Sequence, residues 1–293
     1  MNHLPVLLKE IIDFLAPKKG QVFIDCTLDG GGHSEAILEK IGKRGKLLGI
    51  DIDPSAIEYS QKRLVHFGDR IVFARGNFKN LKEIALRYGF RKVSGILFDL
   101  GLSSLQLEDK TRGFSFSFDA PLDMRMGERE KDASYLVNNL SEGELARIFK
   151  EYGEERFAQR IARRITEERK KTPILRTFKL VEIIKKAIPP KVRWGRIHPA
   201  TRVFQALRIA TNSELENLHL ALPRAIELLA PQGKIVVISF HSGEDRIVKN
   251  FFKEKGKEGK IKILTKKPIR SSFEEILKNP RSRSAKLRAA SKL

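Results

Sequence analysis

Val22-Phe-Ile-Asp-Cys-Thr-Leu-Asp-Gly-Gly-Gly-His33 joins a short apolar run to a cluster of three glycines. The apolar run is typical of a buried strand, and apolar residues recur at helical spacing from Ser34 to Ile41. A glycine-rich turn between a strand and a helix lets a ligand approach the backbone and directs free helix N-terminal amides towards it. The glycines alone are equally explained by a tight turn that needs positive φ angles.

The same alternation of strand and helix continues to about residue 99. We expect further strands over 46–51, 70–74 and 93–99, and helices over 54–64 and 81–88. Asp53 and Pro54 form a typical helix start, with Asp53 as the N-cap. Strands and helices joined by short links predict an α/β fold, with a parallel sheet covered on both faces.

The pattern changes after residue 107. Polar sequence gives way to helical periodicity that lasts to about residue 189, and Ser141-Glu-Gly-Glu144 is typical of a capping box. Helices from about 201 and over 215–229, then strands over 233–240 and 260–264, restore the earlier rhythm. We therefore predict an α/β domain over 1–107 and 201–293, and an inserted all-helical domain over 108–200. Residues 279–293 are basic and poor in apolar side chains, which predicts a mobile tail.

Charge points to an anionic polymer as partner. The 293 residues include 57 Lys and Arg against 36 Asp and Glu, a formal charge of +21. Two segments hold this excess, 156–202 with a net +12 and 251–293 with a net +10, so the rest of the chain is close to neutral. Such a distribution is expected where phosphates bind selected faces, although each segment alone fits a solvated surface. The insertion is the predicted site of RNA recognition.

Other classes of protein are disfavoured. One cysteine, Cys26, excludes an intrachain disulfide and a multi-thiolate zinc site, and we expect no metal. The first residues lack a basic segment before an apolar stretch, and no apolar run approaches the roughly 18 residues of a membrane span. The sequence therefore predicts a soluble, cytoplasmic protein.

Asp51 indicates an adenosine cofactor. It ends the second predicted strand 19 residues beyond Gly32, where an acidic side chain reaches ribose hydroxyls. Asp53 is the alternative, and we favour the N-cap role for it. A nicotinamide dinucleotide fits less well, because Glu35 replaces the third glycine of its pyrophosphate fingerprint. S-adenosylmethionine contains adenosine without phosphate, so it is the cofactor that we predict.

Asp99 ends the fourth predicted strand, beside the same crevice. Ligands of open α/β sheets bind at the carboxyl ends of the strands. Asp99 is therefore expected to hold the ammonium group of the cofactor or to accept a hydrogen bond from an amino nucleophile. Capping the loop that follows the strand is the structural alternative.

Seven strings together resemble one family, the ribosomal RNA small-subunit methyltransferase H family, also called MraW. They are Asp25-Cys-Thr-Leu-Asp-Gly-Gly-Gly-His33, Gly49-Ile-Asp51, Ile96-Leu-Phe-Asp-Leu-Gly101, Arg112-Gly-Phe-Ser-Phe116, Pro121-Leu-Asp-Met-Arg-Met126, Tyr152-Gly-Glu-Glu-Arg-Phe157 and Ser239-Phe-His-Ser-Gly-Glu-Asp-Arg246. The resemblance runs from about Pro5 to the basic tail. It implies a class I methyltransferase with a Rossmann-like sheet, which uses S-adenosylmethionine to methylate N4 of one cytidine in bacterial small-subunit (16S) ribosomal RNA.

The resemblance also implies which residues contact the cofactor. They are Gly31, Gly32, His33, Asp51, Phe78, Asp99 and Gln106, with Phe78 against the adenine. Two positions depart from the family pattern, where glycine is usual at Asp29 and leucine at Gly243. Asp tolerates the left-handed backbone better than most residues, so the turn at Asp29 can persist.

Other residues remain open. Arg202 and Arg208 are equally consistent with contacts to RNA and with cations on a helix surface. A lone histidine such as His241 is more often structural than catalytic, so we leave it out of the site. Cys26 is expected in the core, because an exocyclic amine needs no covalent attack on the ring.

Two rival functions remain. One is an RNA-binding ribosome assembly factor with an inactive methyltransferase fold, against which Asp51, Asp99 and the glycines argue. The other is a DNA amino-methyltransferase, which typically has Pro-Pro-aromatic after the acidic residue, where this chain has Leu100-Gly101.

Overall fold

The computed structural model describes residues 4–192 and 197–293, which form two compact units. The first unit consists of residues 1–103 and 215–293, and the second of residues 104–214. The second unit thus begins four residues before the insertion predicted over 108–200 and ends fourteen residues after it. The physical reason is the helix α10 (Thr201–Asn212), whose buried residues Val203, Phe204 and Leu207 pack against helices of the second unit.

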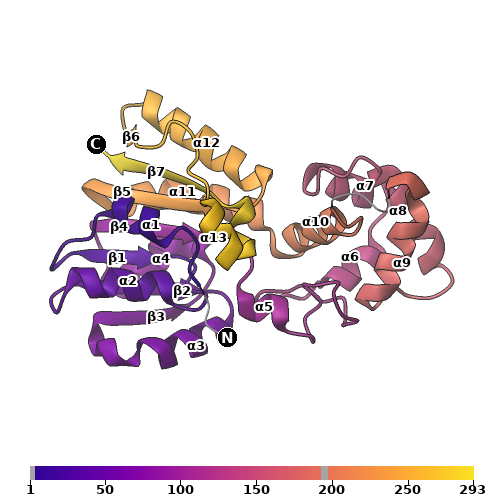
Figure 1. Ribbon diagram of the computed structural model, residues 1–293, viewed down its shortest axis with the longest axis horizontal. Helices are drawn as coiled ribbons and strands as arrows, with labels where there is room; N and C mark the ends of the chain where they lie inside the picture. Colours follow the sequence, from indigo (N-terminus) through magenta and orange to yellow (C-terminus); the bar gives the residue numbers. More distant parts are fainter. Residues whose placement is uncertain (1–3, 193–196) are drawn as a thin grey trace. The chain divides into compact units, whose positions relative to one another are not determined.

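The first unit contains a sheet that has seven strands within the described residues, in the order β3-β2-β1-β4-β5-β7-β6 (Figure 1). They are β1 (Val22–Asp25), β2 (Lys46–Asp51), β3 (Ile71–Arg75), β4 (Val93–Asp99), β5 (Leu229–Ser239), β6 (Ile261–Ile263) and β7 (Lys286–Lys292). The first five are parallel, and β7 is antiparallel to β5 and β6. The strand order reverses between β1 and β4, so ligands are expected above the carboxyl ends of these strands.

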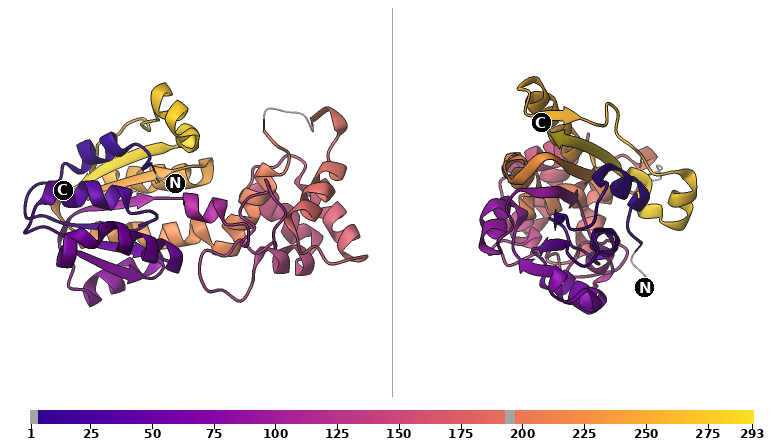
Figure 2. Two further views of the ribbon diagram at one scale, coloured as in Figure 1. Left: turned by 60° about the horizontal axis from the view of Figure 1, so that its bottom comes forward. Right: turned by 90° about the vertical axis from the view of Figure 1, so that its left-hand side faces the viewer.

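Helices cover both faces of this sheet (Figure 2). One face is covered by α1 (Leu8–Leu15), α2 (Gly32–Ile41) and α3 (Pro54–Leu64), and the other by α4 (Leu81–Arg87), α11 (Glu214–Leu228) and α12 (Ser242–Lys257). Successive strand residues point to opposite faces, so Phe23 belongs to the first core and Ile24 to the second. The predicted α/β fold is confirmed.

The prediction of a mobile tail is wrong. Within residues 279–293, β7 lies inside the sheet, with Leu287, Ala289 and Ala290 fully buried. Arg288 is also buried, and its Nε donates to Asp245 Oδ1 at 2.6 Å. The ion pair lets a cation occupy an interior strand, where an unpaired charge would be too costly. Small and apolar residues between cations therefore form a strand that resembles a tail in composition.

The second unit is built from helices, as predicted. They are α5 (Ser104–Glu108), α6 (Ala133–Asn139), α7 (Glu142–Glu151), α8 (Ala158–Arg169), α9 (Thr177–Ala187) and α10. Ser141 starts α7 with the predicted capping box, in which its side chain accepts from the Glu144 amide and the Glu144 side chain accepts in return. An isolated bridge between Pro121 and Arg176 also occurs in this unit.

Four short 3-10 segments and one short helix complete the described fold. They are η1 (Val65–Arg70), η2 (Phe78–Asn80), η3 (Pro190–Val192), η4 (Pro280–Ser284) and α13 (Phe273–Lys278). Over residues 4–192 and 197–293, none of the helices has both the length and the apolar character that crossing a membrane requires.

Candidate active site

The loop between β1 and α2 adopts the strained turn that its glycines suggest. Gly31 has a φ of 73° and is the N-cap of α2, and Asp29 has a φ of 46°. Asp29 therefore occupies the left-handed region, as we predicted for the departure at this position. A Cβ at Gly31 would also lie 3.1 Å from Leu64 Cδ1, so the Leu64 side chain would have to shift by a few tenths of an ångström. The free amides of the first turn of α2 thus begin at the carboxyl edge of β1.

His33 and Asp99 form the centre of the candidate site. His33 Nε2 lies 3.2 Å from Asp99 Oδ2, and both side chains are buried. An ionised carboxylate only accepts hydrogen bonds, so Nε2 is the donor and Nδ1 of a neutral ring is left as an acceptor. Nδ1 of His33 and Oδ1 of Asp99 have no hydrogen-bond partner among the described residues. Two buried acceptors without partners are costly, and a bound ligand that donates to them would remove that cost.

Asp25 is hydrogen-bonded to residues on both sides of the His33–Asp99 pair, and the sequence assigned it no role. Its Oδ2 accepts from Ser34 Oγ at 2.7 Å, which ties the end of β1 to the first turn of α2. Its Oδ1 accepts from the amide of Thr27 at 3.2 Å, and Thr27 Oγ1 in turn accepts from the amide of Asp99 at 2.6 Å. Asp25 therefore connects both sides of the site.

Burial raises the pKa of Asp25 to about 7. The charge of His33 opposes this rise when its ring is protonated, as does the hydrogen bond from Ser34, but neither outweighs the loss of water around the carboxylate. Asp25 therefore gains or loses its proton near neutral pH, close to the side chains of His33 and Asp99.

Asp51 lies at the carboxyl end of β2, close to the glycine loop. Its Oδ2 accepts from the Asp29 amide at 3.0 Å and its Oδ1 from the Asp53 amide at 2.8 Å. Burial raises the pKa of Asp51 to about 6, and the two amides act against that rise. The amide of Ile52 acts in the same direction. A carboxylate has about four acceptor positions in all, so Asp51 can still accept from a ribose hydroxyl.

Asp53 has the structural role that we favoured for it. Its side chain accepts from the Ser55 amide at 3.0 Å and caps α3. The alternative assignment of Asp53 to the ribose is therefore not needed.

Phe78 lies near the same edge of the sheet. The Gly76 amide donates to Asp51 O at 2.8 Å, which brings the chain after β3 alongside β2. The half-buried ring of Phe78 meets the ring of Phe98 edge-on, with centroids 5.7 Å apart. Phe98 directly precedes Asp99 in β4, and Phe78 follows β3 at the carboxyl edge of the sheet, where Asp51 ends β2.

The remaining predicted contact, Gln106, is buried on α5 and belongs to the second unit. The structure therefore brings together six of the predicted residues in the first unit: Gly31, Gly32, His33, Asp51, Phe78 and Asp99.

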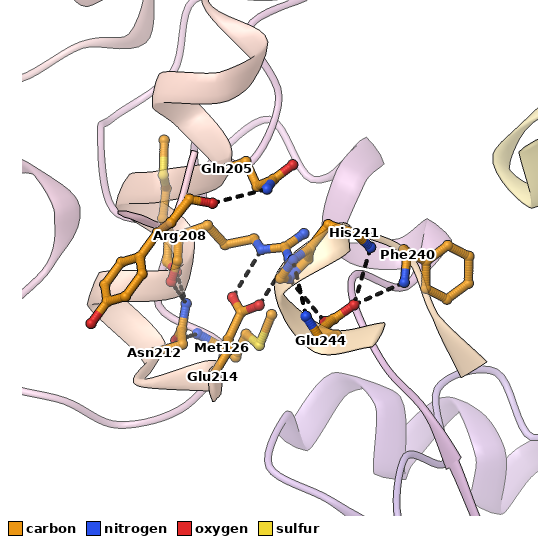
Figure 3. A network of polar contacts seen from close by, with 10 residues as sticks. Met126, Gln205, Arg208, Asn212, Glu214, Phe240, His241 and Glu244 are labelled. Carbon is orange, nitrogen blue, oxygen red and sulfur yellow. Dashed lines mark hydrogen bonds and ion pairs between the residues drawn. The ribbon is translucent and has the colours of Figure 1, made fainter. Parts of the chain in front are cut away.

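Arg208 has a structural role within the second unit. Its Nε and Nη2 donate to the two carboxylate oxygens of Glu214, each at 2.8 Å (Figure 3). Only 13% of the Arg208 side chain is exposed, so a contact with a phosphate would require breaking this ion pair. Arg202 donates to Glu154 O at 3.1 Å and lies towards the surface.

His241 is structural, as expected. It is the N-cap of α12, its side chain accepts from the Glu244 amide, and Glu244 accepts from the amides of Phe240 and His241 (Figure 3). Gly243, the other departure from the family pattern, lies in the first turn of α12, where a Cβ would lie 3.1 Å from His241 Nδ1. Cys26 is buried in the core, as predicted, and burial raises its pKa well above the usual range.

The chemistry of these residues suits a nucleoside bearing an amino acid. Asp51 offers a carboxylate acceptor for a ribose hydroxyl, Asp99 Oδ1 offers an acceptor for an ammonium group, and Phe78 offers an apolar ring. Nothing in the set resembles a cradle for a dianionic phosphate, because Asp25, Asp51 and Asp99 are all acidic. This agrees with a cofactor that has adenosine and no phosphate.

Comparisons with known proteins agree with this assignment. All 293 residues match the model of the MraW methylase family. The chain is 48% identical to "Ribosomal RNA small subunit methyltransferase H" of Heliobacterium modesticaldum, with 100% of this chain and 99% of the relative covered. It is 49% identical to the protein of the same name from Carboxydothermus hydrogenoformans, with 100% and 98% covered.

A solved structure confirms the fold class. A protein from Clostridium thermocellum, described as a candidate rRNA methylase, matches with a TM-score of 0.50 at 15% identity, with both chains covered in full. The mostly parallel sheet with helices on both faces is that of the class I methyltransferases, as predicted.

Proposed function

Because this chain belongs to the MraW methylase family, we propose that it methylates the exocyclic N4 of a cytidine in bacterial small-subunit (16S) ribosomal RNA. Methylation of ribosomal RNA is the activity of the family. We propose in addition that the base is cytidine, that the methylated atom is N4 and that the RNA is that of the small subunit. The observation on which it rests is the His33–Asp99 pair at the end of β4, which keeps an acceptor oxygen of Asp99 for a ligand.

S-adenosylmethionine is the cofactor, and it supplies an electrophilic methyl group on a sulfonium. Asp51 would hold the ribose, Phe78 the adenine, and the loop with Gly31 and Gly32 would let the cofactor approach the backbone. His33 fixes one oxygen of Asp99, so Asp99 Oδ1 points to a single place in the crevice. We expect this oxygen to serve the ammonium group of the cofactor.

The same oxygen could instead serve the nucleophile. The exocyclic amine of cytidine attacks with its own lone pair, so one N–C bond forms, one S–C bond breaks and one N–H proton leaves. An acceptor beside the nitrogen favours the geometry in which the lone pair is free of the ring. Asp99 is the acidic side chain that we propose for this purpose, whether alone or shared with the cofactor.

The RNA partner is proposed from charge. The segment 156–202 has a net charge of +12, and in α8 the described cations Arg160 and Arg163 are exposed. Exposed cations on a helical unit attract the phosphates of RNA without reading its sequence. We propose that the second unit positions the RNA.

Product analysis tests this function. The protein is incubated with S-adenosylmethionine labelled on the methyl group and with small ribosomal subunits, naked 16S RNA or DNA, and the nucleic acid is then digested to nucleosides. The expected product is labelled N4-methylcytidine from RNA. Label on another nucleoside would refute the choice of base, label in DNA would favour the DNA amino-methyltransferase, and no label would favour an inactive assembly factor.

A further inference from the structure

A basic segment leads from β6 into β7 within the first unit. Between residues 266 and 286 there are seven Lys and Arg residues but only two acidic ones, Glu274 and Glu275. Sequence patterns indicate no helix or strand over 266–278, and a mobile tail is predicted only from residue 279 onward. In the structure the segment instead holds a fixed helix, α13, capped by Ser272, whose Oγ accepts from the Glu275 amide at 3.1 Å.

The segment lies at the same edge of the sheet as the candidate active site. After β6 the chain follows β7 as far as Ile269, which pairs with Leu287 near the start of β7. Because β7 is antiparallel to β5, its first residue, Lys286, lies opposite Ser239 at the carboxyl end of β5. The chain from Arg270 to Ala285 therefore lies beyond the carboxyl ends of the parallel strands.

Two hydrogen bonds connect α13 to the chain that covers the glycine loop. Glu275 Oε1 accepts from the Leu7 amide at 2.7 Å, and Asn279 Nδ2 donates to Leu4 O at 3.1 Å. Pro5 lies between Leu4 and Leu7 in the sequence. It packs so closely on Gly32 that a Cβ at Gly32 would lie 3.2 Å from the Pro5 ring. The helix α13 is thus separated from the cofactor loop by a single layer of chain.

Large apolar side chains are exposed on α13 and on the chain bonded to it, and exposed cations lie next to them in the sequence. The exposed fractions are 74% for Phe273, 66% for Leu277 and 52% for Leu4. Arg270 and Lys278 are exposed beside them in the sequence. We call these five residues, Leu4, Arg270, Phe273, Leu277 and Lys278, the α13 surface.

We propose that the α13 surface binds the single-stranded RNA that flanks the target base, with Phe273 as the platform on which one base stacks. This inference rests on the proposed function and adds to it a second RNA contact, outside the insertion. Single-stranded RNA is recognised by aromatic side chains that stack on unpaired bases and by cations that bind the phosphates. Phe273 with Arg270 and Lys278 supplies both within one short segment.

Charge favours RNA over a protein partner here. The core of a protein interface is depleted of charged residues, lysine among them, whereas the segment around Phe273 has five more cations than acids. Position favours RNA as well. A base that leaves its stack to reach Asp99 must be followed by neighbouring nucleotides, and α13 lies at the edge of the sheet where Asp99 is found.

Binding of a fluorescein-labelled 12-nucleotide oligocytidine to the full chain tests the proposal. We expect Phe273→Ala to raise the dissociation constant roughly 5- to 100-fold, the effect of losing one base–aromatic stack. Phe273→Tyr keeps a ring and should bind like the parent. Lys278→Gln should lower the slope of log affinity against log salt by about 0.7, as for one phosphate contact with a single strand.

Tyr88 provides a matched control. It is a 43% exposed aromatic residue in the same unit, and it follows α4 at the opposite edge of the sheet. Tyr88→Ala should leave the affinity for the oligonucleotide unchanged. Calorimetric affinity for S-adenosylmethionine should be the same in all these variants, which shows that the first unit is folded.

Three outcomes would overturn the proposal. The first is that Phe273→Ala binds the oligonucleotide with the affinity of the parent. The second is that Tyr88→Ala loses as much affinity as Phe273→Ala. The third is that light scattering gives a different molecular mass for Phe273→Ala, which would indicate that Phe273 contacts a second copy of the chain. Because the assay measures binding without methyl transfer, its result does not depend on which nucleoside is methylated. Failure of the proposed function and failure of this inference are therefore distinguishable.

Discussion

Replacing Asp25 by asparagine should make the stability of the protein less dependent on pH. In the parent, burial raises the pKa of Asp25 from 3.8 to about 7. The folded state therefore binds a proton that the unfolded state has released, and the free energy of unfolding falls as pH rises between these two values. Above about pH 7 both states are ionised and the fall ends. The asparagine side chain of the variant has no such proton, so the difference between variant and parent should grow with pH.

The size of the effect follows from the shift in pKa. Each pH unit inside the window changes the free energy of unfolding by about 1.4 kcal/mol, so between about pH 5 and about pH 8 the variant should gain about 2 to 3 kcal/mol relative to the parent. Any constant cost of the new amide group, such as a weaker contact with Ser34, is the same at every pH and cancels in this comparison. Asp51 titrates in both proteins and cancels in the same way. The variant also removes the charge by which Asp25 raises the pKa of Asp29, and this change favours the variant at high pH, in the same direction.

Urea unfolding of both proteins in steps of pH, followed by circular dichroism, measures this difference. Ser34→Ala offers a second variant, since the Ser34 hydroxyl lowers the pKa of Asp25 and its loss should extend the window to higher pH. Parallel stability curves for the parent and for Asp25→Asn would refute the reasoning. They would mean that water or a counter-charge reaches Asp25 and removes the cost of its burial.

The other predictions concern the cofactor, the RNA and the end of the sheet. Asp51→Ala should weaken calorimetric binding of S-adenosylmethionine by about 1 to 3 kcal/mol, the cost of a charged hydrogen bond, in a protein that stays folded; an unchanged affinity would exclude Asp51 from the ribose site. Asp99→Asn should reduce methyl transfer more than RNA binding, and near-parental turnover would rule out both roles proposed for this carboxylate. Changing the exposed cations Arg160, Lys170 and Lys185 to glutamine should lower the salt slope of RNA binding by about 0.7 to 0.9 per lost contact without changing cofactor affinity; an unchanged slope would identify them as solvated surface. Deleting residues from 280 onward should abolish cooperative unfolding, because it removes β7 from between β5 and β6; a folded truncated protein, seen by calorimetry, would contradict this.

The order of strands and helices in the first hundred residues could be predicted because local patterns determine it. Apolar runs, glycines and the cap at Asp53 all lie within a few residues of the elements that they define. Asp51 and Asp99 could be placed at the carboxyl ends of their strands for the same reason, since each ends an apolar run. Their meeting at one edge follows from parallel pairing.

β7 and Asp25 were missed because non-local contacts determine them. In β7 the partner that allows Arg288 to be buried, Asp245, is 43 residues away, and nothing near residue 288 indicates it. Asp25 occurs in a string that we quoted, but its importance comes from complete burial and from its bonds to Ser34 and Thr27. Neither burial nor hydrogen bonding can be read from spacing alone.

The position of β7 has a consequence for how the chain folds during synthesis. β7 is the latest of the seven strands in the sequence, yet it lies inside the sheet, between β5 and β6. Until the ribosome has released it, β5 has an open edge with unsatisfied amides and carbonyls, which can pair with strands of other nascent chains. A chain that ends before β7 therefore lacks an interior strand, and the unpaired edge of its β5 favours aggregation. Only chains that include β7 can pair the edge of β5, so we expect chains that end before β7 to aggregate or to be degraded.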